Sequence, residues 1–187
     1  MADPLLDEKV VLIERALTEA AIPHAFGGAL ALAYYAEPRA TIDVDVNVFV
    51  SPDELERVLG ALEPLGMTSN TESRNRAVRD GQARFAWGAT PIDVFFSYDE
   101  FHEHAARRVR RVPLGDAEIA ILAPEDLLVC KAVFDRRKDW LDIEQMLFTT
   151  AGDLDVEGVR AAVVRFVGED DQRVARLDTA IAEILGA

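Results

Sequence analysis

The stretch TIDVDVNVFV, residues 41–50, constrains the fold more than any other part of the chain. Its apolar residues occupy every second position, with Asp43, Asp45 and Asn47 between them. Because side chains alternate between the two faces of a strand, this pattern predicts a strand with one apolar and one polar face. Asp43 and Asp45 then lie on the same face, about 6.5 to 7 Å apart along the strand.

Two unpaired carboxylates on a valine-rich strand repel each other, and a bound divalent cation would relieve that repulsion. Hard oxygen ligands favour magnesium. A second alternating run, TPIDVFFS at residues 90–97, places Asp93 on the face opposite its apolar neighbours. If the two strands are neighbours, three carboxylates converge as two-metal phosphoryl transfer requires. We therefore expect Asp43, Asp45 and Asp93 to be metal ligands.

Gly27 and Gly28 lie between a short predicted strand and the start of a helix. Without side chains they let the backbone approach a triphosphate closely, and the first amide groups of the helix can donate to phosphate oxygens. A pair of glycines alone more often marks a tight turn. Together with the three aspartates, the pair favours a phosphate-binding site.

The chain as a whole predicts an α+β fold, with a small mixed β-sheet flanked by helices and a helical C-terminal half. Strands are expected at 24–26, 41–50, 84–88, 90–97, 110–114 and 118–123. Helices are expected at 6–21, 28–37, 52–65, 100–108, 125–134, 138–149, 156–167 and 171–185, the third of them with a capping box formed by Ser51 and Glu54. The polar segment after Gly66 has no clear period. We divide the chain into a core that carries the double glycine and the D-x-D motif, residues 1–122, and a helical region, residues 123–187, that completes the site.

Composition limits the classes of partner and site. The net charge of −14 opposes a nucleic-acid partner, yet residues 74–138 carry 12 Lys and Arg against 10 Asp and Glu, leaving 8 against 24 elsewhere. The single cysteine, Cys130, excludes an internal disulfide framework and a cysteine-based zinc site. No apolar run approaches the roughly 20 residues that span a bilayer, and no secretory signal is present, so we expect a cytoplasmic protein without a membrane partner.

The run FGG followed by RATIDVDV resembles the signature of the DNA polymerase beta-type nucleotidyltransferase superfamily. The form R-x-T-x-D-x-D, built here from Arg39, Thr41, Asp43 and Asp45, is similar to the AbiEii and MenT nucleotidyltransferase toxins of bacterial toxin–antitoxin pairs. The resemblance runs from about Phe26 to Leu147 and implies the nucleotidyltransferase fold.

Two further elements carry the likeness to this branch. Its members have a lysine in a helix after PEDL and then a KDxxD element, matched here by Lys131 in PEDLLVCK and by Lys138, Asp139 and Asp142 in KDWLDIEQML. The resemblance implies catalytic roles for Asp43, Asp45, Lys131 and Asp142, and nucleotide binding by Gly27, Gly28, Arg39, Thr41, Lys131 and Asp139. The residues alone also allow a surface lysine at 131, pairing of Asp139 or Asp142 with Arg136 or Lys138, and an Arg39 that anchors its loop through Asp43.

The activity implied by the resemblance is magnesium-dependent transfer of a nucleoside monophosphate from a nucleoside triphosphate (NTP) to a tRNA 3′ end. The protein would then be a growth-inhibiting toxin with a possible cognate antitoxin. The same chemistry on an antibiotic or protein hydroxyl is an alternative, since an acidic protein suits a cationic aminoglycoside better than tRNA. A catalytically silent binding or antitoxin module is a third hypothesis, which the intact set of aspartates and Lys131 disfavours.

Overall fold

The structure is a computed structural model that describes residues 3–150, 152 and 154–186, and it divides into two compact units. The first unit comprises the chain up to Leu30 together with Ala40–Leu122. The second comprises Ala31–Arg39 and the chain from Ala123 onward. The predicted α+β class is confirmed, because a mixed sheet and its helices form the first unit and helices form the second.

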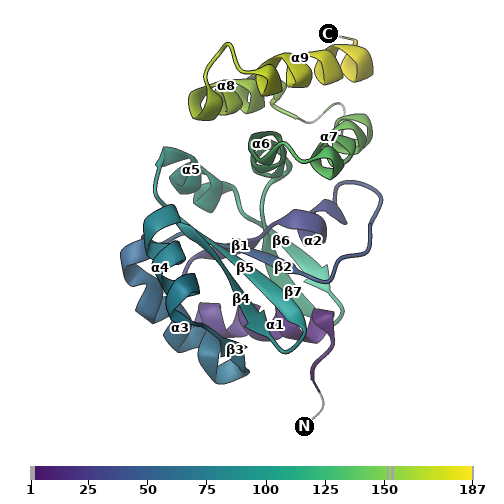
Figure 1. Ribbon diagram of the computed structural model, residues 1–187. Coiled ribbons are helices and arrows are strands. Elements are labelled where there is room, and N and C mark those ends of the chain that lie inside the picture. The colour runs from purple at the N-terminus through teal and green to yellow at the C-terminus, as the bar shows by residue number, and fades with distance from the viewer. Residues whose placement is uncertain (1–2, 151, 153, 187) are drawn as a thin grey trace. The chain divides into compact units, whose positions relative to one another are not determined.

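The first unit is built on a mixed sheet, seven-stranded within the described residues, in the order β3-β4-β5-β2-β1-β7-β6 (Figure 1). Its strands are β1 His24–Phe26, β2 Val44–Val48, β3 Met67–Thr68, β4 Gln82–Trp87, β5 Thr90–Phe96, β6 Arg110–Leu114 and β7 Ala117–Ile121. The pairs β2–β5 and β1–β7 are parallel, and the other neighbours are antiparallel. The two strands that carry the predicted metal ligands are therefore direct neighbours.

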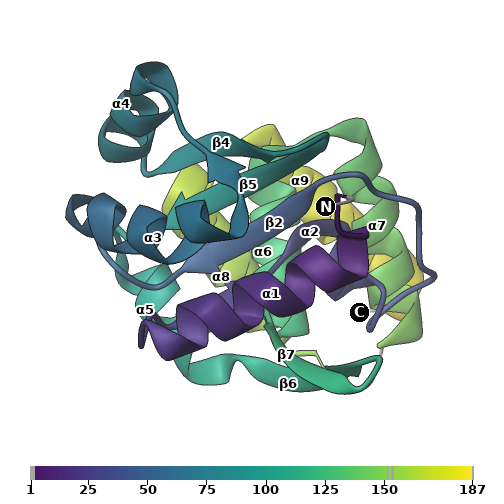
Figure 2. The same cartoon turned by 90° about the horizontal axis from the view of Figure 1, so that it is seen from below.

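Helices α1 (Leu6–Glu19) and α3 (Leu55–Leu62) lie side by side on one face of this sheet (Figure 2). Both helices bury apolar residues at helical spacing: Val10, Ile13, Leu17, Val58, Leu59 and Leu62. The alternating apolar residues of β2 and β5 are also buried, and these two sets form the core. Helix α5 (Glu100–Arg108) is capped by Asp99, whose carboxylate accepts hydrogen bonds from the Phe101 and His102 amides.

Four local expectations are corrected. The segment after Gly66 contains helix α4 (Thr71–Asp80), which is held by an Asn70–Ser73 capping box and ends at Gly81 with φ +67°. Only Ser73 and Ala77 of α4 are buried, so the helix has no apolar stripe from which the sequence could predict it. Strand β2 is shorter than residues 41–50 and leaves Asp43 just before its first residue.

The other two corrections concern helix ends. Helix α2 (Gly28–Leu32) stops five residues earlier than expected, where the Tyr34 and Tyr35 amides bond carbonyls only three residues back. The expected helix at 52–65 is divided into a 3-10 turn (Pro52–Glu54), α3 and a second 3-10 turn (Glu63–Leu65). Ser51 accepts a hydrogen bond from the Asp53 amide, so the capping box with Glu54 does not form.

The second unit is helical. It contains α6 (Pro124–Phe134), α7 (Arg137–Thr149), α8 (Val156–Val167) and α9 (Gln172–Leu185), and the last residues of α2 also belong to it. Trp140 is 1% exposed, donates to Asp135 at 2.6 Å, and is covered by the Arg176 guanidinium at 4.4 Å from the ring centre. No helix among the described residues is both long and apolar enough to span a membrane.

Candidate active site

The predicted carboxylates meet on the first unit's sheet because of strand register. The parallel pairing of β2 with β5 places Asp45 directly opposite Asp93. Their neighbours Val44 and Ile92 are buried at 1% exposure or less, so alternation turns both carboxylates to the opposite face. Asp43 precedes β2 by one residue, and its side chain is 27% exposed. The condition stated for convergence of the three carboxylates, that the two aspartate strands are neighbours, is thus met.

Gly27 and Gly28 lie against Asp45. The Gly27 amide donates to the Asp45 carbonyl at 2.9 Å, which ties the glycines to β2. Gly28 has φ +54°, and a Cβ atom at this position would lie only 1.8 Å from Asp45 Oδ2. The carboxylate therefore fills the space that any other residue's side chain would need. Glycine is required here by both backbone conformation and close approach.

Thr41 orients Asp43. Its hydroxyl donates to Asp43 Oδ1 in a short hydrogen bond and accepts from the Asp43 amide at 3.3 Å. The neighbouring Ile42 is 76% exposed, so the loop is not anchored by apolar packing there. The local hydrogen bonds with Thr41 help to hold Asp43 just before the start of β2. Thr41 was predicted to bind nucleotide, and this geometry gives it a role in positioning a carboxylate.

Arg84 is a site residue that the sequence reasoning missed. Its guanidinium donates to both carboxylate oxygens of Asp93, at 2.8 and 2.6 Å, and lies 3.9 Å from Asp43 Oδ2. The bond to Asp93, and the charges of Asp93, Asp43 and Asp45, raise the pKa of Arg84 above its usual range although desolvation opposes the shift. The sequence feature that could have revealed Arg84 is the tight hairpin between β4 and β5. The register that pairs Trp87 with Thr90 across this hairpin also pairs Arg84 with Asp93.

The donor set fits a cation that arrives with its own oxygen ligands. No group of three or more His, Cys, Asp or Glu side chains within the described part of the chain is arranged to hold a metal ion alone. Magnesium is commonly bound by one or two carboxylates plus substrate phosphates rather than by a closed protein cage. Asp43 and Asp45 provide such carboxylates, and the Asp45 carboxylate lies directly against the Gly28 backbone.

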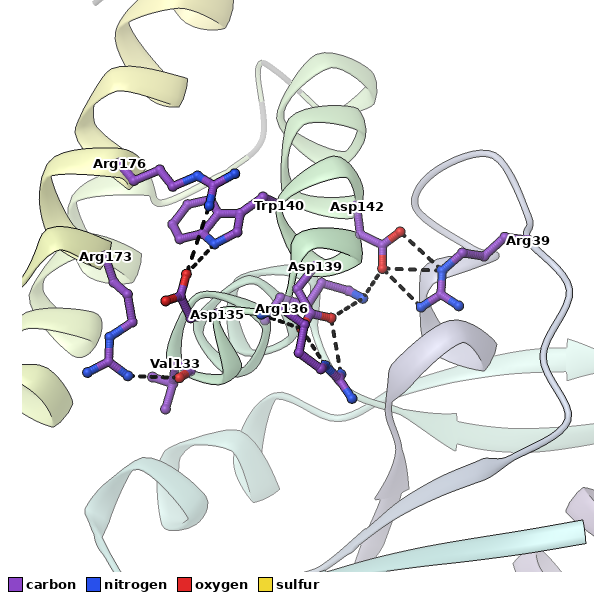
Figure 3. Close-up of polar contacts among 10 residues, drawn as sticks. Arg39, Val133, Asp135, Arg136, Asp139, Trp140, Asp142, Arg173 and Arg176 are labelled. Atoms are coloured by element: carbon purple, nitrogen blue, oxygen red, sulfur yellow. Dashed lines mark hydrogen bonds and ion pairs between the residues drawn. The ribbon is translucent and has the colours of Figure 1, made fainter.

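A second polar cluster lies in the second unit (Figure 3). Lys131 donates to Asp142 at 2.6 Å and lies 4.0 Å from Asp139. Arg39 donates to both carboxylate oxygens of the same Asp142: its Nε lies 3.1 Å from Oδ1 and its Nη2 lies 3.1 Å from Oδ2. Asp139 in turn accepts from Arg136 at 2.6 and 3.1 Å. The KDxxD aspartates therefore organise three cations rather than lying exposed on a helix.

The residues of this cluster differ in how far their side chains are exposed to solvent. The side chains of Lys131, Asp139 and Asp142 are at most 5% exposed, whereas that of Arg39 is 32% exposed. A surface role for Lys131 is excluded, as is anchoring of Arg39 through Asp43, because Arg39 instead binds Asp142. Arg39 also lines a cavity of about 260 Å³ with Glu37, Pro38, Lys138, Leu141, Asp142 and Gln145. It is thus more accessible to a ligand than Lys131.

Most arginines of the locally basic middle are paired with carboxylates. The pairs are Arg74 with Glu56 and Glu63, Arg76 and Arg79 with Asp80, Arg107 with Glu103, and Arg111 with Glu14. Apart from Arg111, whose partner Glu14 is buried, these pairs are exposed and contribute only about 0–1 kcal/mol each, so a phosphate backbone could displace their carboxylates. The arginines do not, however, form a surface of unbalanced positive charge.

Comparison with known proteins identifies the family. The sequence profile described as "Nucleotidyltransferase of unknown function (DUF6036)" matches residues 21–184. The chain belongs to this nucleotidyltransferase family. It is therefore an enzyme of the nucleotidyltransferase type, as the superfamily resemblance indicated. The narrower likeness to AbiEii and MenT toxins stays a hypothesis.

Solved structures share the fold at low sequence identity. The antibiotic-resistance factor ANT(2'')-Ia has a TM-score of 0.60 and 14% identity, over 97% of this chain and 100% of that chain. An antigenic nucleotidyltransferase-like protein from Paracoccidioides brasiliensis has a TM-score of 0.56 and 14% identity, over 95% and 87%. The lincosamide antibiotic adenylyltransferase LnuA has a TM-score of 0.53 and 10% identity, over 76% and 96%. No curated protein matches this nucleotidyltransferase significantly in sequence.

Proposed function

We propose that this nucleotidyltransferase binds an NTP with a divalent metal ion, magnesium being the preferred one, at Asp43, Asp45 and the Gly27–Gly28 backbone. The observation that carries the proposal is the close approach of the Asp45 carboxylate to the Gly28 backbone. A phosphate held by the glycine backbone would lie next to a carboxylate that ligates the metal. The ion, when bound, neutralises triphosphate charge during transfer.

In the proposed reaction an acceptor hydroxyl attacks the α-phosphorus of the NTP. A new phosphorus–oxygen bond forms as the bond to the β-phosphate oxygen breaks, the hydroxyl proton is lost, and pyrophosphate leaves. Asp43 and Asp45 supply hard oxygen ligands, and Thr41 keeps Asp43 in place. Asp93 is the third carboxylate, with its contribution governed by its bond to Arg84.

We propose that the Lys131–Asp142–Arg39 cluster also supports nucleotide use. Arg39 is the member suited to contact a phosphate, because it is partly exposed and presents a planar guanidinium. Lys131 and Asp142 fix its position from within the helical unit. This assigns the helical region 123–187 a part in the activity and makes Asp139 a structural partner of Arg136 and Lys131.

The reaction type is tested with NTPs labelled either at the α- or at the γ-phosphate. Incubation with magnesium and a cell extract is expected to transfer the α-label to an acceptor and to release the γ-label in pyrophosphate. Transfer of the γ-label to the acceptor would indicate a kinase and contradict the proposal. Absence of transfer from all four ribonucleoside triphosphates would also contradict it.

A tRNA 3′ end is the acceptor we favour, with growth inhibition by this toxin countered by a cognate antitoxin in the cytoplasm. Its support is the R-x-T-x-D-x-D resemblance and the exposed arginines 107, 108 and 110 at the end of α5 and the start of β6. Phosphate contacts make binding depend on salt, so RNA labelling should fall steeply as salt is added.

Replacing Arg107, Arg108 and Arg110 together by Gln should lower RNA labelling about tenfold and flatten its salt dependence. Arg165→Gln, on the exposed surface of α8, is the control and should leave both unchanged. A triple variant with an unaltered salt slope would contradict this RNA contact.

The second candidate acceptor is a small cationic molecule with a free hydroxyl, such as an aminoglycoside. The net charge of −14 and the pairing of the middle arginines with carboxylates favour it. Labelling of an aminoglycoside but not of RNA at low salt would select this candidate and overturn the tRNA assignment.

A further inference from the structure

Arg84 occupies the position at which a cation would meet the third carboxylate. Strand register places Arg84 opposite Asp93 on β4–β5, and Asp93 opposite Asp45 on β5–β2. One guanidinium thus faces carboxylates contributed by two neighbouring segments. It bonds both Asp93 oxygens, at 2.8 and 2.6 Å, and its Nη2 also lies 3.9 Å from Asp43.

This contact uses both oxygens of Asp93. Each of these oxygens keeps a second lone pair, but the guanidinium places a positive charge beside the carboxylate and repels a metal ion there. A metal ion therefore ligates Asp93 more strongly once the arginine has moved away. The side chain of Arg84 is 59% exposed while that of Asp93 is 17% exposed. The arginine can therefore move into solvent at little packing cost, whereas the carboxylate is held on the sheet.

We propose that Arg84 is a built-in counter-ion that competes with the metal for the third carboxylate of the site. Without nucleotide, Arg84 neutralises Asp93 and keeps free divalent metal weakly bound. A metal–NTP complex brings additional phosphate ligands, so it displaces the arginine and loads the site with metal and nucleotide together. Arg84 is thus a positioning residue that couples metal binding to nucleotide binding. This inference rests on the proposed function.

The chain offers a matched control in Arg79. Arg79 bonds both oxygens of Asp80, each at 2.7 Å, so it forms an arginine–aspartate pair of the same geometry away from the three carboxylates. Its side chain is 73% exposed. Replacement of Arg79 by Gln removes the same chemical group and the same kind of bond without altering the charge facing Asp93.

The test is titration of the full chain with Mn²⁺, followed by electron paramagnetic resonance in the absence of nucleotide. Arg84→Gln should tighten Mn²⁺ binding roughly tenfold, since a charge-assisted bidentate bond no longer competes for Asp93. Arg84→Lys, which retains charge but loses the fork geometry, should fall between wild type and Arg84→Gln. Arg79→Gln should match wild type. Unchanged or weaker Mn²⁺ binding by Arg84→Gln would overturn the inference.

Thermal unfolding gives a second readout if Arg84→Gln is less stable. A ligand that binds the folded state raises the unfolding temperature, so Mn²⁺ should raise that of Arg84→Gln more than that of wild type. Equal shifts would also overturn the inference. The variant Asp45→Asn separates the two proposals: if it abolishes Mn²⁺ binding while Arg84→Gln has no effect, only the counter-ion role fails. If Mn²⁺ binding survives Asp43→Asn/Asp45→Asn in full, the proposed metal site itself fails.

Discussion

At the scale of single residues, the site depends on how closely Gly28 and Asp45 approach each other. Gly28 has φ +54°, and the carboxylate occupies the space of its missing Cβ atom. The D-x-D and GG patterns are therefore two halves of one packing arrangement. An alternating strand and a double glycine were visible in the sequence, but their contact depends on the chain folding back from α2 to β2.

Gly28→Ala tests this contact against a matched control. Gly115 has a similar φ of +59°, but no atom lies within 4 Å of a Cβ built there, so Gly115→Ala carries only the backbone penalty of about 1 kcal/mol. Gly28→Ala carries the same penalty and also forces Asp45 to move. We expect it to lose transferase activity at least about 100-fold, whereas Gly115→Ala retains it. Equal activity in the two variants would contradict the role of the close approach.

At the scale of elements, burial and contacts between distant residues determine which side chains pair, and the local sequence pattern does not show these partners. The helix containing Lys131 and the KDxxD helix were both predicted from the sequence, but the bond from Arg39 to Asp142 joins residues 103 positions apart. Anchoring of the loop by Arg39 through Asp43 was an alternative that the residues allowed, and tertiary packing instead pairs Arg39 with Asp142. Helix α4 was not predicted because it is stabilised by its capping residues at each end and has no apolar stripe.

Lys131→Met should destabilise the helical unit. The substitution leaves the buried Asp142 and Asp139 without their buried cation, and loss of one partner from such a group costs about 3 kcal/mol. Lys138→Met, at an exposed position seven residues on, should change the free energy of unfolding by less than about 0.5 kcal/mol. Urea denaturation measures both. Similar losses in the two variants would show that burial of Lys131 has been misjudged.

A second buried cluster ties α1 to the sheet and makes a prediction about pH. Burial would raise the pKa of Glu14, but hydrogen bonds from His24, the Ala120 amide and Arg111 outweigh it and lower the pKa from 4.5 to about 2. The folded state therefore keeps Glu14 ionised at pH values where the unfolded chain takes up a proton. The resulting stability is complete above about pH 4.5 and is lost as the pH falls toward 2.

Glu14→Gln should remove this pH dependence. At pH 7 the variant should be less stable by about 2 kcal/mol, because His24 and Arg111 lose a charged partner. Between pH 4.5 and 2 its free energy of unfolding should fall less steeply than that of wild type. Glu19→Gln, at an exposed position of the same helix, should follow wild type throughout. Parallel curves for wild type and Glu14→Gln would contradict the account.

At the scale of the whole molecule, the sequence was sufficient for the fold class and for most strands and helices, whereas the pairing of the two aspartate strands was only a condition that the structure meets. The local periodicity of apolar residues predicts the strands and helices, because it reports which face of each element is buried. Arg84 was missed although the β4–β5 hairpin register pairs it with Asp93. The burial of Lys131 was not predicted, because burial depends on the packed chain. The acceptor could not be predicted from the net charge, because ion pairs between arginines and nearby carboxylates change where charge is exposed without changing the total.

The most direct test of the central claim is the rate of pyrophosphate release in single variants of equal stability. Asp45→Asn removes a proposed metal ligand with little change of shape, and it should lower the rate by at least about 1,000-fold with magnesium and NTP present. Asp116→Asn, in the exposed turn between β6 and β7, loses the same charge and should retain the wild-type rate. Pyrophosphate release by Asp45→Asn at the rate of Asp116→Asn would contradict metal-dependent nucleotidyl transfer at this site.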